Sequence, residues 1–597
     1  MKKNFLIIVL TLSFCAASCS KFLTEEPATS IMGSNVVSNE NNAEAAMTDV
    51  YVRLDNIFLN NPLGTYLGNS SKCRVWTGTR KTTQYEQCHY MTLFSTTSDN
   101  KNLYSEIYSG VNSCNNILYY LPDSPLSEKF KLEIEGEARF LRALFYFTLT
   151  RLYGDVPVVT SPAFEEKDLN IGRTPYQEVY RFILDDLEFA EKNMRSKERQ
   201  IEVNGNSSRV YNYAVYALRS QVYTWIASYV SSPFDQFFDC TKPGRYPDFT
   251  NCGIDTPEQA WTLALKDAEK VILDVNSPYA LEPDYRNLFR WDPVNHPEDY
   301  VSPERIIVTS NTPDYGPKYF VLQTLWLHPA ETISMTGTQS IAGRTRPARW
   351  IWEQWCETYG DTPLNSTGFH TMSPDPRMAA TYQASYCEMW DQDNPGEVIR
   401  SSKLFPDSKS GTSANHYFRK YVSPRYDYNC GDADCYVLRM AEIYLNAAEA
   451  AANLGDKDKA VGYVNEVLKR ARMSVDDSST PATEPADWTA GQFSTEEELV
   501  DAIMMERIYE MHGENHEWFD THRKGAKWLV RNVCIPFNES MADSKNSTVR
   551  KTMDIYGKET ETDVQEVRKA LLCAFPDYEL RTNTALTPSN QNDFYVR

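Results

Sequence analysis

The sequence predicts a mainly α-helical fold, in which tetratricopeptide-like helix pairs form a scaffold and an irregular, loop-rich lobe is inserted between two helical parts. Two observations lead to this prediction. Apolar residues recur with the period of an amphipathic helix in several segments of the 597-residue chain. Prolines and tryptophans are concentrated in one segment between them. The chain therefore divides into four predicted parts, namely residues 1–18, 19–275, 276–430 and 431–597.

Residues 1–18 have the features of a lipoprotein signal peptide. Two lysines precede an apolar run at residues 5–14, which is far shorter than the roughly 20 residues of a membrane-spanning helix. Three small residues come directly before Cys19, whereas Cys15 follows a bulky phenylalanine. We therefore predict that Cys19 is the lipidated first residue of the mature chain. The alternative is an ordinary secreted protein that is cleaved near Ala17.

The composition argues against two classes of function. The chain has 60 lysines and arginines against 81 aspartates and glutamates, a formal net charge of −21, and no basic cluster. Because a surface that binds phosphates needs such a cluster, we expect no nucleic-acid partner. The longest later apolar stretch, at residues 140–149, is interrupted by Arg142. It is therefore predicted to be a buried helix and not a membrane span.

The cysteines do not form a metal-binding pattern. Apart from Cys15 and Cys19, 11 of the 13 cysteines remain, and they lack the C-x2-C spacing of zinc ligands. Two closely spaced pairs are compatible with disulfide bonds outside the cytoplasm, and these are Cys240 with Cys252 and Cys430 with Cys435. Spacing alone does not decide whether either pair is joined.

Helical periodicity marks the two helical parts. It is found in residues 133–153, 211–225, 261–272 and 437–448. Residues 133–153 are apolar nearly all round, as expected for a helix between two layers. After residues 437–448 the chain passes through Gly455 into a second helix, which has Ala460 and Val464 at tetratricopeptide-like positions. Helix pairs spread along the chain in this way favour a short, irregular repeat scaffold.

Residues 276–430 differ from the two helical parts in amino-acid composition. These 155 residues contain 15 of the 31 prolines and 6 of the 12 tryptophans of the chain. Because proline at this density interrupts helices, we expect a loop-rich lobe between the helical parts. Loops on a rigid scaffold often carry binding sites, so this lobe is a candidate for ligand binding.

Residues 512–522 are dense in histidine and acidic side chains, as catalytic sites often are. They do not match a zinc-protease helix, since the position three residues after Glu517 is Asp520 and not the required histidine. His512 and His516 lie about one helical turn apart, but no third metal ligand is in view.

Glu506 and Glu510 are a second candidate for catalysis. They project from the same helical face, whereas glycoside hydrolysis needs carboxylates on opposite sides of the bond. We interpret them as buried carboxylates that pair with arginines such as Arg142 or Arg439. The aspartates around residue 433 lack the third ligand and the glycine of a calcium loop, and no phosphate-binding loop or nucleophile elbow is present. The sequence therefore predicts no catalytic residue, no metal site and no cofactor.

Several motifs resemble those of the SusD/RagB family. Residues 136–157 contain GEARFLRA, YF and LYGDVP in the family's order, and residues 438–450 read LRMAEIYLNAAEA, similar to the family motif LRLAEIYLNxAEA. Residues 506–525 are similar to ERRxELxxEGxRWFDLxRxG, and residues 22–27 and 575–592 also fit. The matches run nearly from end to end of the chain.

Three departures from these motifs mark the chain as a divergent member. Asn515 stands where the family usually has glycine, Glu517 stands where it has arginine, and residues 573–575 replace the usual PIP-like turn. They are expected to change local structure only.

The resemblance implies a lipid-anchored protein on the outer face of a Bacteroidetes-type outer membrane. Such proteins cap a SusC-like TonB-dependent β-barrel transporter and deliver glycans, or peptides in some members, to its mouth. We therefore predict a non-enzymatic lipoprotein that captures glycans. Two alternatives stay open, which are peptide capture on the same scaffold and a helical adaptor that binds only protein.

The glycan-binding residues are predicted from composition and position, because those of the family lie outside its motifs. Sugars stack on aromatic faces and receive hydrogen bonds at their edges. The candidates are Trp350, Trp352, Trp355, Trp326 and Tyr319 in the lobe, and Arg74, Trp76 and Arg80 in the N-terminal part. The competing interpretation of each tryptophan is a core residue.

Overall fold

The computed structural model describes 17 segments of the chain. They are residues 33–58, 67–76, 87–88, 90–165, 170–205, 208–232, 247–289, 301–309, 345–363, 371–382, 388–390, 398–400, 418, 420–421, 434–475, 479–541 and 560–592.

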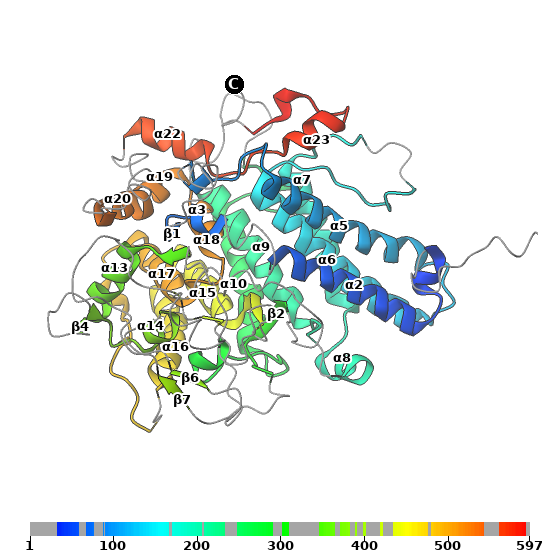
Figure 1. The fold of residues 1–597 in the computed structure, drawn as a ribbon. Coiled ribbons are helices and arrows are strands. Elements are labelled where there is room, and N and C mark those ends of the chain that lie inside the picture. The colour runs from blue at the N-terminus through cyan, green and yellow to red at the C-terminus, as the bar shows by residue number, and fades with distance from the viewer. Residues whose placement is uncertain are drawn as a thin grey trace, which may run out of the picture.

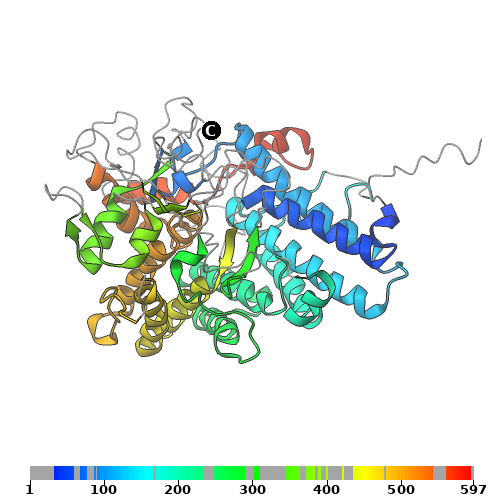
Figure 2. The ribbon, with the colours of Figure 1, turned by 60° about the horizontal axis from the view of Figure 1, so that its bottom comes forward.

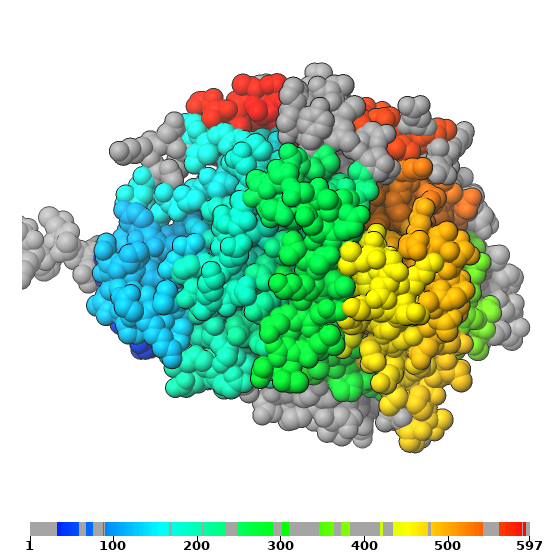
Figure 3. Space-filling view, turned by 180° about the vertical axis from the view of Figure 1, so that it is seen from behind, coloured from blue at the N-terminus to red at the C-terminus, as the bar shows by residue number. Residues whose placement is uncertain are grey.

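The longest helices confirm the predicted mainly α-helical fold. They are α2 (Glu40–Phe58), α5 (Ser98–Tyr120), α6 (Glu128–Tyr153), α7 (Tyr176–Asn193), α9 (Tyr213–Ser231), α10 (Pro257–Leu273), α15 (Met440–Asn453), α16 (Lys457–Met473) and α17 (Glu496–Met511). Eight of them pack in the pairs α2 with α5, α6 with α7, α9 with α10 and α15 with α16, and α17 packs against α15. Further contacts join α5 to α6, α7 to α9 and α10 to α15. Seen from behind, these segments follow one another in chain order across one face (Figure 3).

Helix α6 lies between α5 and α7 and is buried on nearly all sides of its C-terminal half, as predicted. Ser127 begins the helix by accepting a hydrogen bond from the backbone N–H of Phe130, and Gly154 follows its last residue at a φ of 72°. The contact with α5 is close, because a Cβ at Gly110 would lie 2.7 Å from the ring of Phe145. Glycine at this position therefore lets the two helices approach.

Shorter helices connect and flank the scaffold. They are η1 (Gly33–Val37), α3 (Gly68–Ser70), α8 (Lys197–Asn204), η4 (Thr250–Cys252), η5 (Tyr285–Leu288), α13 (Arg349–Tyr359), α14 (Pro376–Thr381), η7 (Ala490–Gln492), α18 (Glu517–His522), α19 (Ala526–Leu529), η8 (Val530–Cys534), α20 (Ile535–Met541), α22 (Glu561–Lys569), α23 (Asp577–Thr582) and η9 (Pro588–Asn590). Helices α2, α5, α6 and α7 lie on one side of the molecule and α13, α19 and α20 on the other, while the C-terminal helix α23 lies beside α5 and α7 (Figure 1, Figure 2).

The strands are short and form antiparallel pairs. They are β1 (Arg74–Trp76) with β3 (Thr345–Pro347), β2 (Arg305–Thr309) with β8 (Cys435–Arg439), β4 (Thr362–Pro363) with β5 (Thr371–Met372), and β6 (Glu388–Trp390) with β7 (Val398–Arg400). The first two pairs join the predicted lobe to the N-terminal and C-terminal parts. Where the structure describes residues 276–430, these residues form short helices and strands as well as loops. The boundaries of the lobe stay a prediction.

The described cysteines are free thiols. Cys252 and Cys435 are among them and both are buried, whereas their candidate partners Cys240 and Cys430 lie outside the described residues. No helix in the described residues is long and apolar enough to cross a membrane.

Candidate functional site

The three tryptophans predicted to form an exposed binding platform are buried, which corrects that prediction. The exposed fractions of Trp350, Trp352 and Trp355 in α13 are 2%, 4% and 0%. The indole N–H of Trp350 donates to the carbonyl of Lys72 at 2.8 Å, and that of Trp355 donates to Asp375 at 2.9 Å. The rings pack against the rest of the core instead of facing solvent, so they cannot stack on a sugar in this conformation.

Arg74 is also part of the interior. Its guanidinium forms an ion pair with Glu517 at 2.7 Å and donates to Asn515 at 2.9 Å, with 1% of the residue exposed. Both partners are departures from the family motif. Asn515 has a φ of 72°, a left-handed conformation that asparagine tolerates better than most residues, which fits the glycine usually found there. Arg74 therefore accommodates the divergent motif, and the structure gives it no exposed surface for a ligand.

The other predicted site residues are not tested by the structure. Cys19, Arg80, Tyr319 and Trp326 lie outside the described residues, as does the side chain of Trp76. Their roles stay predictions.

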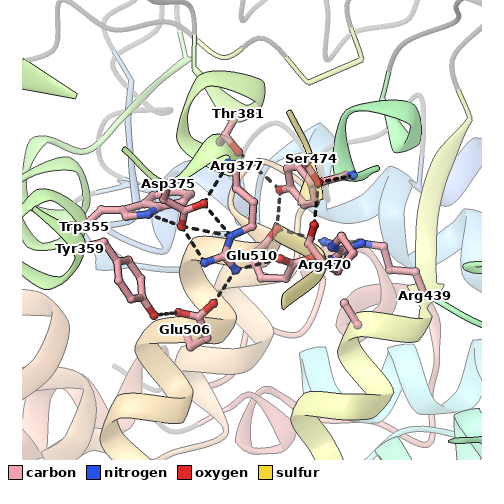
Figure 4. Close-up of polar contacts among 12 residues, drawn as sticks. Trp355, Tyr359, Asp375, Arg377, Thr381, Arg439, Arg470, Ser474, Glu506 and Glu510 are labelled. Atoms are coloured by element: carbon pink, nitrogen blue, oxygen red, sulfur yellow. Dashed lines mark hydrogen bonds and ion pairs between the residues drawn. The ribbon is translucent and has the colours of Figure 1, made fainter. Parts of the chain in front are cut away.

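A buried network of charged side chains occupies the region between α14 and α17 (Figure 4). Arg377 pairs with Asp375 at 2.7 Å, with Glu510 at 3.0 Å and with Glu506 at 2.5 Å, and none of these four side chains is exposed. The hydroxyl of Tyr359 donates to Glu506 at 2.7 Å. Carboxylates that are buried and paired in this way tie elements together and are closed to a substrate.

The network continues toward the scaffold. Arg439 pairs with Glu304 at 2.6 Å, with Glu510 at 2.7 Å and with Glu514 at 2.7 Å, and Arg470 pairs with Glu304 at 2.7 Å and with Glu510. The prediction that arginines neutralise Glu506 and Glu510 is confirmed. Arg439 is one of these arginines.

Arg142, the other arginine that was named, pairs instead with Asp186 of α7, at 2.8 Å. It therefore joins α6 to α7 and lies in a different part of the fold.

The environments of these groups move their pKa values in opposite directions. Burial raises the pKa of Glu506, whereas the three arginines outweigh burial at Glu510 and lower its pKa. Burial lowers the pKa of Lys420, which pairs with Glu514 at 2.7 Å, to about 8. Each cation and carboxylate in the network has a partner, which is the pattern of a structural cross-link.

The histidines of residues 512–522 are engaged in different ways. His512 is fully buried, with one ring nitrogen against the hydroxyl of Tyr382 and the other 3.0 Å from the carbonyl of Cys73, and burial lowers its pKa to about 3. His516 lies 3.5 Å from Glu442, which outweighs burial and raises its pKa. Among the residues that the structure describes, no group of three or more histidines, cysteines and acidic residues is placed to hold a metal ion.

An open groove of about 520 Å³ runs along α5, and its mixed polar and apolar lining suits a binding site. We call it the α5 groove. Ser105, Ser109 and Asn112 of α5 line one part of it, and other lining residues are Pro157, Val159, Ala163 and Ile171, together with Glu579 of α23. The sequence does not predict this groove, because serine and asparagine on a helix carry no recognisable motif.

Two family models match this chain. The model described as the SusD family matches residues 329–595, and the model described as starch-binding and associating with the outer membrane matches residues 18–224. SusD-like protein P25 of Formosa agariphila is 22% identical over 546 residues, which cover 88% of this chain and 90% of the relative.

Solved structures share the fold along nearly the whole chain. A SusD-like protein from Bacteroides fragilis has a TM-score of 0.65 at 18% identity, with 95% of this chain and 99% of that chain covered. A laminarin-binding SusD-like protein has a TM-score of 0.60 at 19% identity, with 94% and 100% covered. Because the two family models together match residues 18–224 and 329–595, this chain belongs to the SusD/RagB family.

Proposed function

We propose that this protein is a cell-surface lipoprotein that captures glycans and delivers them to a SusC-like TonB-dependent transporter of the outer membrane. The observation that carries the proposal is the match of residues 18–224 to a model described as starch-binding and associating with the outer membrane. The laminarin-binding relative among the solved structures supports a glycan over a peptide as the ligand. The particular glycan is left open.

The ligand class is tested on a glycan array with the soluble chain from residue 20 onward. Binding to one or a few neutral glycans is the expected result. A panel of peptides is screened in parallel, and binding to peptides with no response to any glycan would favour the peptide-capture alternative. Binding to neither panel, in a folded sample, would favour the adaptor alternative.

The anchor is tested by acyl labelling of cells that produce the full chain. Lipid is expected on Cys19, and Cys19→Ala should release the protein from the membrane fraction. Cys15→Ala is the matched control and should leave acylation unchanged. Acylation that persists in the Cys19→Ala variant would contradict the assignment.

The transporter is tested by co-purification in mild detergent. A β-barrel protein of the outer membrane is expected to elute with the tagged lipoprotein. Recovery of the free lipoprotein alone under several mild detergents would contradict the proposed partner.

We also propose that the protein binds its ligand without cleaving it. The buried ion pairs of Glu506 and Glu510 support this, since neither carboxylate reaches solvent. Chromatography of the bound glycan after prolonged incubation should recover it intact.

A further inference from the structure

We infer that the α5 groove and a cluster of exposed aromatic side chains at the C-terminal end of helix α5 together form a binding site for a neutral oligosaccharide. The inference rests on the proposed function and adds a location that the sequence did not predict. Its parts are the polar lining of the groove, three aromatic rings, and the helical geometry that aligns them.

The lining of the groove is rich in uncharged polar groups. Ser105, Ser109 and Asn112 lie on the α5 wall, and Asn583, directly after α23, is buried with its amide donating to the carbonyl of Ile171. Hydroxyl and amide groups both donate and accept hydrogen bonds, as sugar hydroxyls do. Tyr108 adds an aromatic side chain to the same wall, and its hydroxyl donates to the carbonyl of Pro157 at 2.7 Å.

The charge of the groove fits a neutral ligand. Arg53 and Glu579 are its charged lining residues, and they carry opposite signs. Arg53 also lies 3.3 Å from Asp49 on its own helix. An anionic polymer would need several cations at such a surface, so a neutral polymer is favoured.

The aromatic cluster consists of Tyr119, Tyr120 and Phe164. Tyr119 and Phe164 are 45% and 56% exposed, although both are large. The rings of Tyr120 and Phe164 are stacked with centroids 5.9 Å apart, and Tyr119 meets both edge-on. Large exposed rings that gather at one place are typical of a surface that binds something. Because they support one another, their positions are set before a ligand arrives.

Helical geometry places the groove and the cluster on one line. Ser105, Asn112 and Tyr119 are seven residues apart in α5, close to two full turns, so they project from the same side of the helix. The loop reinforces this alignment, because the side-chain oxygen of Asn112 accepts from the backbone N–H of Ala163 at 2.9 Å. Phe164 is the next residue. A ligand that follows α5 would therefore pass from the polar groove onto the exposed rings.

The combination favours a carbohydrate over a protein partner. Sugar rings present C–H faces that stack on aromatic side chains and hydroxyl edges that receive hydrogen bonds. A protein interface of stable size usually has an apolar centre surrounded by a polar rim. Here the polar groove and the aromatic cluster lie end to end along the helix, an order that suits an extended chain of sugar rings.

The test is native affinity electrophoresis of the soluble chain from residue 20 onward, in gels that contain laminarin or soluble starch. We compare the wild type with Tyr119→Ala, Phe164→Ala and the double variant. Loss of one stacking ring should raise the dissociation constant about fivefold, and loss of both by roughly twentyfold. Leu273→Ala removes an apolar side chain that is 63% exposed at the end of α10 and should have no effect.

Both rings are exposed, so the variants are expected to keep the wild-type melting temperature and circular dichroism. Should the alanine variants lose structure, Tyr119→Leu and Phe164→Leu keep apolar bulk without an aromatic face, and the same loss of retardation is expected. If neither polymer retards the folded wild type and the glycan array shows no binding to any other glycan, both the proposed function and this site are contradicted. If the polymer retards the wild type and the folded ring variants equally, the proposed location of the site is wrong, while the proposed glycan-binding function stands.

A protein interface is the competing outcome. Ring variants that bind the polymer as the wild type does, but no longer co-purify with an outer-membrane β-barrel protein, would overturn the inference in favour of a docking surface.

Discussion

The charged C-terminal interior and the α5 groove have opposite chemistry. The interior places Arg377, Arg439 and Arg470 among carboxylates with almost no exposure, so each charge is neutralised by a protein partner. The groove is open and mostly uncharged, and Ser105, Ser109 and Asn112 in its lining keep part of their surface exposed. Among the described residues, this dense collection of arginines and carboxylates has the pairing of a structural cross-link.

The comparison shows why residue type alone misidentifies a site. A buried charge without a partner is strongly unfavourable, so arginines and carboxylates in an interior are drawn together whether or not they do chemistry. A binding site for a neutral polymer needs only uncharged hydroxyl and amide groups together with exposed aromatic rings. Under the proposed function, the binding site is expected where charge is sparse and the surface is accessible.

The largest expected effect comes from breaking the interior network. Arg470→Met leaves Glu304 and Glu510 with one cation fewer, and the free energy of unfolding should fall by about 3–5 kcal/mol. Lys469→Met is the matched control on the same helix, since its pair with Glu466 is 3.7 Å long and both side chains are more than half exposed. Its effect should stay within ~0.5 kcal/mol. Urea unfolding followed by tryptophan fluorescence measures both. Similar losses in the two variants would contradict a network that depends on burial.

A smaller effect is expected from pH. The pKa of His512 is about 3 in the folded protein, against about 6.5 in an unfolded chain. The folded state therefore binds fewer protons below pH 6.5, so the stability linked to this group is complete above that pH and is lost as pH falls toward 3. Between pH 7 and pH 5 this loss amounts to about 2 kcal/mol. His512→Gln should remove it.

His516→Gln is the control for the pH experiment. Because Glu442 raises the pKa of His516, this group stabilises the folded state as pH falls, and its removal should make the protein more sensitive to acid. Unfolding free energies at pH 7 and pH 5 distinguish the two variants. If the unfolding free energy of the two variants depends equally on pH, the opposite pKa shifts of His512 and His516 are contradicted.

The smallest effect on stability is expected at the groove. Asn112→Ala removes one hydrogen bond to the loop and should lower the free energy of unfolding by only about 0.5–1 kcal/mol, while it weakens glycan binding. Asn115, one turn further along α5, is buried and bonded to Arg142 at 2.8 Å and to the carbonyl of Val159 at 3.0 Å. Asn115→Ala should therefore lower stability by about 1–3 kcal/mol. A larger loss at Asn112 than at Asn115 would show that the groove is structural.

The placement of the tryptophans shows where the sequence analysis went wrong. The proline content of residues 276–430 led us to expect loops, yet residues 349–359 form α13. Trp350, Ile351, Trp355 and Tyr359 are buried in it and recur at helical spacing, a signal that was present in the sequence. Local periodicity should have outweighed the average composition of the segment.

The prediction that Arg74 binds a glycan failed for a different reason. The partners of Arg74, which are Asn515 and Glu517, lie more than 400 residues away in the chain. No local pattern identifies such a pair, although the two departures from the family motif indicated that something nearby had changed.

The sequence by itself determined the helices, the mainly α-helical class and the family motifs. These depend on local periodicity, on capping residues such as Ser127, and on short-range motifs, all of which are written within a few turns of the chain. Only the tertiary structure decided which polar side chains are neutralised inside and which face a groove. That distinction depends on burial, and burial is created when remote segments such as α5 and α23 meet.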